Sequence, residues 1–99
     1  MSWCNNRLTV VGVKRQVQSF QKSVWATALG AKHAELLENS PRRFSCELET
    51  DDPPLESLKA LSRRWPTLTL LLDYEVQAKR VKGLAKAKSG VLMDHRVTY

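Results

Sequence analysis

Hydrophobic and polar residues alternate in five segments of the chain, a period typical of strands that bury one face. In residues 7–11, Leu8 and Val10 share one face, and Gly12 ends the run. The same alternation returns in residues 44–50 and in three later segments. It predicts strands at residues 7–11, 44–50, 68–76, 81–87 and 91–99.

Two other segments repeat their hydrophobic residues every three or four positions, as amphipathic helices do. One extends from Val13 to a stop near Gly30, and the other from Leu55 to the residue before Pro66. The apolar positions are Val13, Val17, Phe20 and Val24 in the first helix and Leu55, Leu58, Leu61 and Trp65 in the second. Residues 31–38 are interpreted as a further short helix that ends before Pro41.

The turn between the last two strands decides which of their side chains share a face. A two-residue turn at residues 89–90 would place Lys86 opposite Met93. A three-residue loop at residues 88–90 would instead place Ala85 opposite Met93 and keep one face of the hairpin apolar. The sequence therefore predicts the three-residue loop.

Together these elements predict one α+β domain over residues 1–99. A chain of 99 residues is long enough for a single modest core. Crossover connections through the two main helices predict parallel pairing of the first three strands, followed by an antiparallel C-terminal meander. We expect a two-layer sandwich with both helices on one face of a mixed sheet and the other face open.

The N-terminal residues resemble the start of a known family. The run Trp3-Cys4-Asn5-Asn6-Arg7-Leu8-Thr9-Val10-Val11-Gly12 fits Trp-Cys-x-Asn-x-Leu-x-Val-x-Gly, with which YubB-type ferredoxin-like domains begin. The resemblance resumes at Pro53-Pro54, residues 58–69, Tyr74-Glu75 and Gly83. It implies a ferredoxin-like fold and an origin in phages, plasmids or genomic islands, and no established activity.

The chain departs from this family in its middle part. Members usually have a longer insertion after the first helix, an aromatic residue where Asp51-Asp52 stand and a glycine-rich stretch where residues 76–80 stand. The family therefore suggests architecture and genetic context more strongly than a shared binding surface.

The formal net charge of +6, from 16 Lys and Arg against 10 Asp and Glu, favours anionic partners. Residues 79–88 are basic, but the expected strand pairing gives two of these charges acidic partners, with Glu75 facing Arg80 and Asp73 facing Lys82. Open-face bases and acids are predicted to balance: Arg7, Arg80, Lys82, Lys86 and Arg96 against Glu47, Glu49, Asp73, Glu75 and Asp94. The surplus of basic residues then falls on the helical layer and its loops. The candidate polyanion patch there is Lys14, Arg15, Lys22, Lys59 and Arg63. The alternative is that these side chains are scattered over the surface and only hydrated.

Leu71, Leu84 and Leu92 are predicted to lie together on the open sheet face, inside a charged rim. Such a cluster is a candidate protein interface, either for a partner or for a homodimer. The aromatic residues are instead expected in the core or under the helices: Trp3, Phe20, Trp25, Phe44, Trp65 and Tyr74.

The residues with reactive or metal-binding side chains do not suggest an enzyme. Cys4, Cys46, His33 and His95 lack the spacing of paired metal ligands, and both thiols are expected to be reduced and buried. No phosphate-binding glycine loop is present. We expect no catalytic residue, no metal and no cofactor. Without a signal sequence or membrane-spanning run, a cytoplasmic location is expected.

These patterns lead to two functional hypotheses. The first is a non-enzymatic module of a mobile element that binds a protein or nucleoprotein complex, such as an anti-CRISPR-like inhibitor of a host defence complex. The second is direct binding of DNA or RNA through the basic patch on the helical layer, dominated by phosphate contacts.

Overall fold

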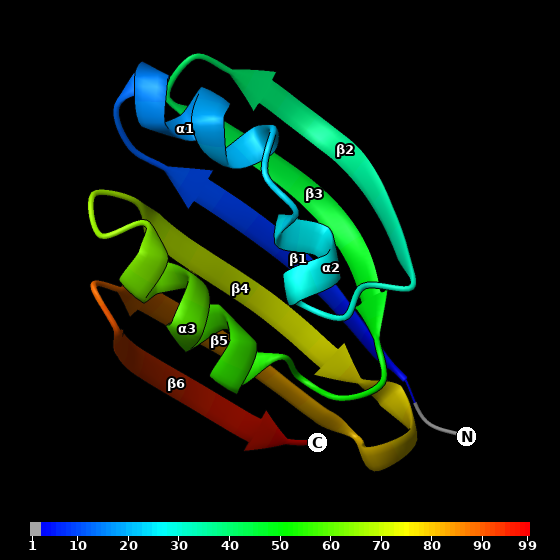
Figure 1. Cartoon of the computed structure of the whole chain (residues 1–99). Coiled ribbons are helices and arrows are strands. Elements are labelled where there is room, and N and C mark those ends of the chain that lie inside the picture. The colour runs from blue at the N-terminus through cyan, green and yellow to red at the C-terminus, as the bar shows by residue number, and fades with distance from the viewer. Residues whose placement is uncertain (1–2) are drawn as a thin grey trace.

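Six strands and three α-helices make up the structure, a computed structural model that describes residues 3–99 (Figure 1). The strands are β1 (Cys4–Val11), β2 (His33–Ser40), β3 (Arg43–Thr50), β4 (Thr69–Val76), β5 (Val81–Lys88) and β6 (Val91–Thr98). The helices are α1 (Lys14–Gln21), α2 (Trp25–Ala28) and α3 (Leu55–Arg64), and a 3₁₀ turn, η1 (Gln77–Lys79), precedes β5.

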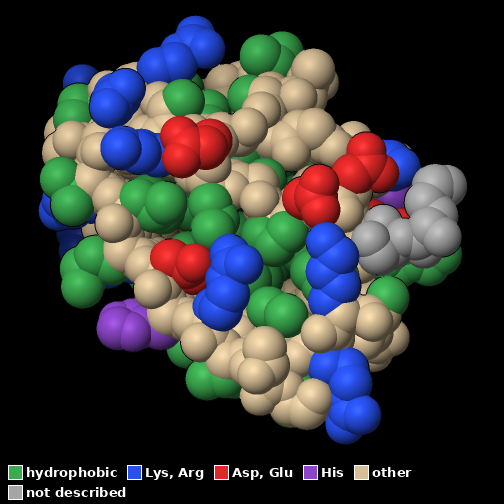
Figure 2. Space-filling view, turned by 90° about the horizontal axis from the view of Figure 1, so that it is seen from below, with side chains coloured by type: hydrophobic (Ala, Val, Ile, Leu, Met, Phe, Trp, Pro, Cys, Tyr) green, Lys and Arg blue, Asp and Glu red, His purple; other side chains and the backbone are tan. Residues whose placement is uncertain are grey.

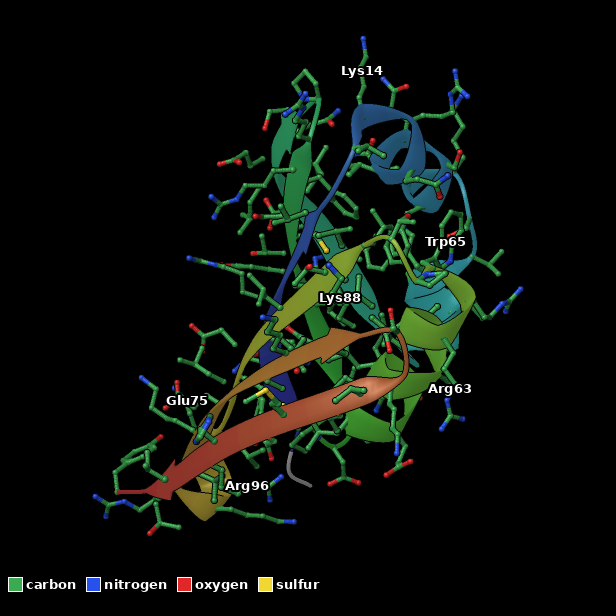
Figure 3. All side chains as sticks on the ribbon, turned by 90° about the vertical axis from the view of Figure 1, so that its left-hand side faces the viewer. Lys14, Arg63, Trp65, Glu75, Lys88 and Arg96 are labelled. Atoms are coloured by element: carbon green, nitrogen blue, oxygen red, sulfur yellow. The ribbon has the colours of Figure 1, made fainter. Side chains whose placement is uncertain are left out.

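The strands form one antiparallel sheet in the order β2-β3-β1-β4-β5-β6. All three helices cover one face of this sheet, and the opposite face is open (Figures 1 and 3). The expected α+β architecture is confirmed, and the layers are consistent with a two-layer sandwich. Each crossover joins two strands of the same direction with an antiparallel strand between them, so the predicted mixed sheet is wrong.

The segment expected to form a helix over residues 31–38 instead forms the edge strand β2. The pairing with β3 begins just before β2, where the Lys32 N–H donates to the Glu49 carbonyl at 2.8 Å. Within β2, Ala34 lies opposite Leu48. Backbone pairing along β3 overrides the helix tendency of this Ala-, Leu- and Glu-containing segment. The first crossover therefore ends at β2, and β3 returns antiparallel to β1 with Cys46 opposite Leu8.

The first predicted helix is divided into α1 and α2. Residues 22–24 interrupt it, where the Ser23 N–H and hydroxyl both donate to the Phe20 carbonyl, at 3.0 and 2.6 Å. A serine side chain that occupies this carbonyl competes with continuation of the helical hydrogen bonds. Gly30, with φ of 71°, then ends α2 in the left-handed conformation.

The hairpin of β5 and β6 uses the register that the sequence pattern disfavoured. A two-residue turn at Ser89 and Gly90, with φ of 51° and 80°, places Lys86 opposite Met93. Positive φ at both positions is typical of the type I′ turns that match strand twist. The three-residue loop is therefore wrong: β6 directs Val91, Met93 and Val97 to the open face, whereas Leu92, Asp94 and Arg96 lie on the helical side.

The core lies between the sheet and the helices. Phe20 of α1 is its aromatic centre, with ring centroids 6.1 Å from Trp25, 5.8 Å from Phe44 and 5.5 Å from Trp65. These side chains and Tyr74 are buried or half-buried, as expected from the sequence. Trp3 is the exception because it precedes β1 and is 54% exposed.

Candidate functional site

An apolar cluster stands on the open face of the sheet, formed by Leu71, Leu84 and Met93 from β4, β5 and β6. Their side chains are exposed by 38%, 62% and 55%. A surface cavity of about 470 Å³ lies over them. Its lining residues are Arg7, Thr9, Leu71, Leu72, Asp73, Leu84, Ala85, Lys86, Met93 and His95.

Strand pairing sets the pattern within the apolar cluster. Leu84 lies opposite Asp73 on one side and opposite His95 on the other, and Lys86 lies between Leu71 and Met93. Leucine and methionine side chains therefore alternate with charged groups across the strands. A lysine beside such a surface can cover apolar atoms with its methylene groups while its ammonium group remains hydrated.

The open face changes to a mainly acidic surface at the end next to this cluster. A second cavity of about 490 Å³ lies there, lined by residues of β1 to β5. Its acidic residues are Glu35, Glu47, Glu49, Asp73 and Glu75. Arg7 reaches Glu47 at 3.3 Å, while Glu35 stands opposite the same glutamate. Like charges placed directly opposite one another are unfavourable, so this end is predisposed towards a cationic partner group.

The charge distribution differs from the predicted balanced face. Arg80 lies after η1 and its guanidinium stacks over the Tyr99 ring at 5.6 Å, so it is not part of the face. Asp94 and Arg96 contact the buried Tyr74 on the helical side. The sheet pairing also shifts by two residues from the expected register, so that Lys82 faces Glu75.

The result is a face with a basic end and an end where acidic residues outnumber Arg7 and Lys82. Glu47, Glu49 and Asp73 mark the acidic end, and Lys86 and Lys88 lie towards the other end, beyond Leu84. Separated charges on either side of an apolar cluster can orient a complementary partner and increase its association rate.

Two of the three leucines predicted to form an interface do share this face. Leu92 does not, because the two-residue turn directs it to the helical side, where it is half-buried against the core. Met93 takes its place beside Leu84 in the apolar cluster. The Ser-Gly dipeptide at residues 89–90, which suits a type I′ turn, was the sequence signal for this register.

The candidate polyanion patch is spread over α1, the residue that follows it and α3, and the two helices lie in different parts of the helical layer (Figure 1). Lys14 projects from the outer end of α1, whereas Arg63 lies on α3 in another part of the helical layer (Figure 3). The Arg63 side chain packs over Gly90, where an added Cβ would stand 2.6 Å from Cγ. Lys59 on the same helix is half-buried. The patch residues are Lys14, Arg15, Lys22, Lys59 and Arg63.

Basic side chains are interspersed with other types at the end of the molecule near η1. Figure 2 shows this end, where Lys and Arg alternate with acidic and hydrophobic side chains. A strong phosphate-binding surface usually concentrates its basic side chains on one face or groove. The surface drawn in Figure 2 does not have that character.

The buried polar groups are engaged within the protein. Asn6 donates through Nδ2 to the Leu48 carbonyl at 3.2 Å and to the Thr50 hydroxyl at 3.0 Å, while its Oδ1 accepts from Cys4 Sγ at 3.4 Å. Within residues 3–99, each buried side-chain nitrogen or oxygen has a hydrogen-bond partner. The buried polar side chains of the described residues therefore have structural roles, and the exposed groups on the sheet are the better candidates for binding.

Both cysteines are buried and reduced. Burial raises the pKa of the Cys46 thiol to about 12, and burial is also the main cause of a raised pKa at Cys4. Their thiols therefore stay protonated near neutral pH, which disfavours nucleophilic reactions. In the described residues, His, Cys, Asp and Glu form no group of three suited to a metal ion.

None of the helices in residues 3–99 has the length and apolar character needed to cross a membrane. Comparisons with protein-family models, curated proteins and solved structures find no match to this chain. The open face, rather than a relative, supplies the basis for a functional proposal.

Proposed function

We propose that this protein is a non-enzymatic interaction module that binds a protein partner through the open face of its sheet. The observation that carries the proposal is the exposed apolar cluster of Leu71, Leu84 and Met93 beneath a 470 Å³ cavity. An apolar surface bordered by charged groups is typical of protein-binding surfaces. The partner would cover the leucine and methionine side chains and place cationic groups towards the acidic end.

A ferredoxin-like unit would account for how the open face arises. Strands β1 to β4 and the intervening helices follow a β-α-β-β-α-β order, if α1 and α2 are taken as one helical segment. Their arrangement in the sheet, β2-β3-β1-β4, supports this proposal. The β5-β6 hairpin then widens the sheet on the β4 side and supplies Leu84 and Met93 to the apolar cluster.

The resemblance to YubB-type domains adds a proposed biological setting. A small basic module from a phage, plasmid or genomic island could act on a host nucleoprotein, such as a defence complex. The acidic and basic ends of the open face fit a partner whose surface carries charged groups of both signs. Neither catalysis nor a cofactor is required for inhibition by binding.

The test compares two leucines of similar exposure. Leu84→Glu should abolish capture of the partner by purified protein, because it places a carboxylate in the apolar cluster. Leu36→Glu on β2 is the matched control, since Leu36 is 56% exposed and lies outside the apolar cluster. Capture from the natural host, followed by reconstitution with the purified partner, would measure both. Equal binding by the two variants and wild type would overturn the proposed surface.

The same purified proteins can distinguish protein binding through the open face from nucleic-acid binding through the helical layer. Labelled DNA and RNA would be titrated at low and high salt with wild type and with Arg15→Glu/Arg63→Glu. A strongly salt-dependent affinity that falls in the double variant, while Leu84→Glu binds normally, would assign function to the helical layer instead.

A further inference from the structure

Strand β6 is an open sheet edge with regular geometry. Its pairing with β5 continues from Val91 to Thr98 without a register shift, and among residues 3–99 no element borders its outer side (Figure 1). The other edge, β2, has a bulge between Leu36 and Glu38. Bulges protect edges against pairing with another chain, and β6 lacks that protection over its described length.

The outward backbone groups of β6 can be assigned from the turn. In a two-residue hairpin, Lys88 and Val91 form the hydrogen-bonded pair that closes the loop. Bonding to β5 then alternates along the strand, and it reappears where the Tyr99 N–H donates to the Arg80 carbonyl at 2.9 Å. The N–H and carbonyl groups that point away from the sheet are those of Leu92, Asp94, Arg96 and Thr98.

We propose that a second copy of this chain pairs with β6 across a two-fold axis, with His95 of each copy at the axis. In this antiparallel register Asp94 lies opposite the partner's Arg96, and Arg96 lies opposite the partner's Asp94. These are residues whose backbone groups face outward. The pairing joins two six-stranded sheets into one, a form of strand addition in which backbone hydrogen bonds supply affinity.

Charge selects this register over its neighbours. A two-fold axis perpendicular to the sheet permits shifts only in steps that keep the same faces together. One shifted register sets Asp94 against the partner's Asp94, and the other sets Arg96 against the partner's Arg96. Like charges directly opposite one another are destabilising, so both are disfavoured.

The same two side chains already contact each other within one chain, where Arg96 Nη2 lies 3.4 Å from Asp94 Oδ2. In the dimer they would form a ring of four alternating charges. Each arginine would gain a second carboxylate without losing its first. A network of several charges contributes more than an isolated exposed ion pair.

Dimerisation would also enlarge the apolar surface. The register places Met93 opposite the partner's Val97 on the open face, where both residue types are exposed. The apolar clusters of the two copies would then belong to one continuous face. The self-pairing does not rest on the proposed partner binding, because it uses the β6 edge rather than the cavity over Leu84.

Charge reversal with cross-complementation tests this dimer. Sedimentation equilibrium of the wild-type chain at tens of micromolar should give twice the mass of one chain. Asp94→Arg and Arg96→Asp should each weaken the dimer at least about tenfold, because each brings like charges together. Mixing these two variants should restore a dimer, since the two arginines of the first variant then lie opposite the two aspartates of the second in the proposed register.

Three controls distinguish this interface from others. Glu35→Arg on the β2 edge and Leu84→Glu in the apolar cluster should leave the dimer mass unchanged. Circular dichroism checks that each variant is folded, and the combined Asp94→Arg/Arg96→Asp variant, which retains complementarity, replaces the mixture if a single variant is unfolded. A monomeric wild type, or a dimer lost through Glu35→Arg and kept in Asp94→Arg, would overturn the proposal.

Discussion

The ring of Tyr74 lies directly on Gly83 of the neighbouring strand. The two residues are opposite one another in the β4-β5 pair, and a Cβ added to Gly83 would overlap Cζ of the Tyr74 ring. The ring extends across β5 towards β6, where its hydroxyl donates to Asp94 Oδ1 at 2.7 Å and accepts from Arg96 Nε at 3.2 Å. One buried side chain therefore connects three strands, and only glycine leaves space for it.

Replacing this glycine should destabilise the protein. We expect Gly83→Ala to lower the free energy of unfolding by about 1–3 kcal/mol, because the new methyl group forces the Tyr74 ring from its position. Urea denaturation would measure the loss. In the control, Tyr74→Leu removes the end of the ring, so adding Gly83→Ala to it should cost less than in wild type. An undiminished cost in that background would contradict a direct Tyr74–Gly83 clash.

The Tyr74 hydroxyl should contribute to stability in its own right. Tyr74→Phe is expected to cost about 1–2 kcal/mol, because Asp94 and Arg96 both lose a hydrogen-bond partner at a half-enclosed site. Tyr99→Phe is the control: its hydroxyl donates to Glu75 on the exposed surface, and its loss should change stability by less than about 0.5 kcal/mol. Urea denaturation that gave equal losses for both variants would refute the importance of the Tyr74 network.

The sequence pattern identified the strands that bury one face against helices. β1, β3 and β4 show alternation because Leu8, Cys46 and Leu72 are covered on the helical side, whereas neighbours such as Arg7, Glu47 and Asp73 are exposed. β2 has no such contrast, since all of its residues from His33 to Ser40 are exposed. Its strand conformation depends on pairing with β3 across the turn at residues 41–42, a contact that the periodicity within β2 does not encode.

The candidate site was predicted in part for a related reason. Leu71 and Leu84 sit on strands whose inner face is apolar, so their place on the open face follows from alternation. In β6 most of the apolar residues, Met93 among them, face the open side, whereas Asp94 and Arg96 face the helical side and meet Tyr74. The rule that apolar residues face the core therefore selected the wrong register and placed Leu92, rather than Met93, in the cluster.

A buried serine should hold the β5-β6 turn against α3. Ser62 Oγ accepts from the Gly90 N–H at 2.9 Å and donates to the Lys59 carbonyl at 2.7 Å. Ser62→Ala leaves the Gly90 N–H without its partner, so we expect a loss of about 1–2 kcal/mol and faster hydrogen exchange at the Gly90 amide. Ser57→Ala, on the same helix, should leave this amide unchanged. Unaltered Gly90 exchange in Ser62→Ala would contradict the role of the serine.

The buried thiol of Cys46 predicts a loss of stability at alkaline pH. Its pKa rises from 9.0 to about 12 in the folded protein, so the thiol keeps its proton there while the unfolded chain loses it. The unfolded state then binds fewer protons, and stability falls as pH rises between these values. Relative to Cys46→Ala, wild type should lose about 2 kcal/mol between about pH 8 and pH 10.5.

Urea denaturation of both proteins in the presence of a reductant would measure this difference. Comparison with Cys46→Ala cancels the lysines and tyrosines that titrate over the same range, together with Cys4. The substitution itself leaves a small cavity and lowers stability at every pH, so only the change in the difference with pH reports the thiol. A constant difference between the two proteins across this range would mean that Cys46 ionises equally easily in the folded and unfolded chains.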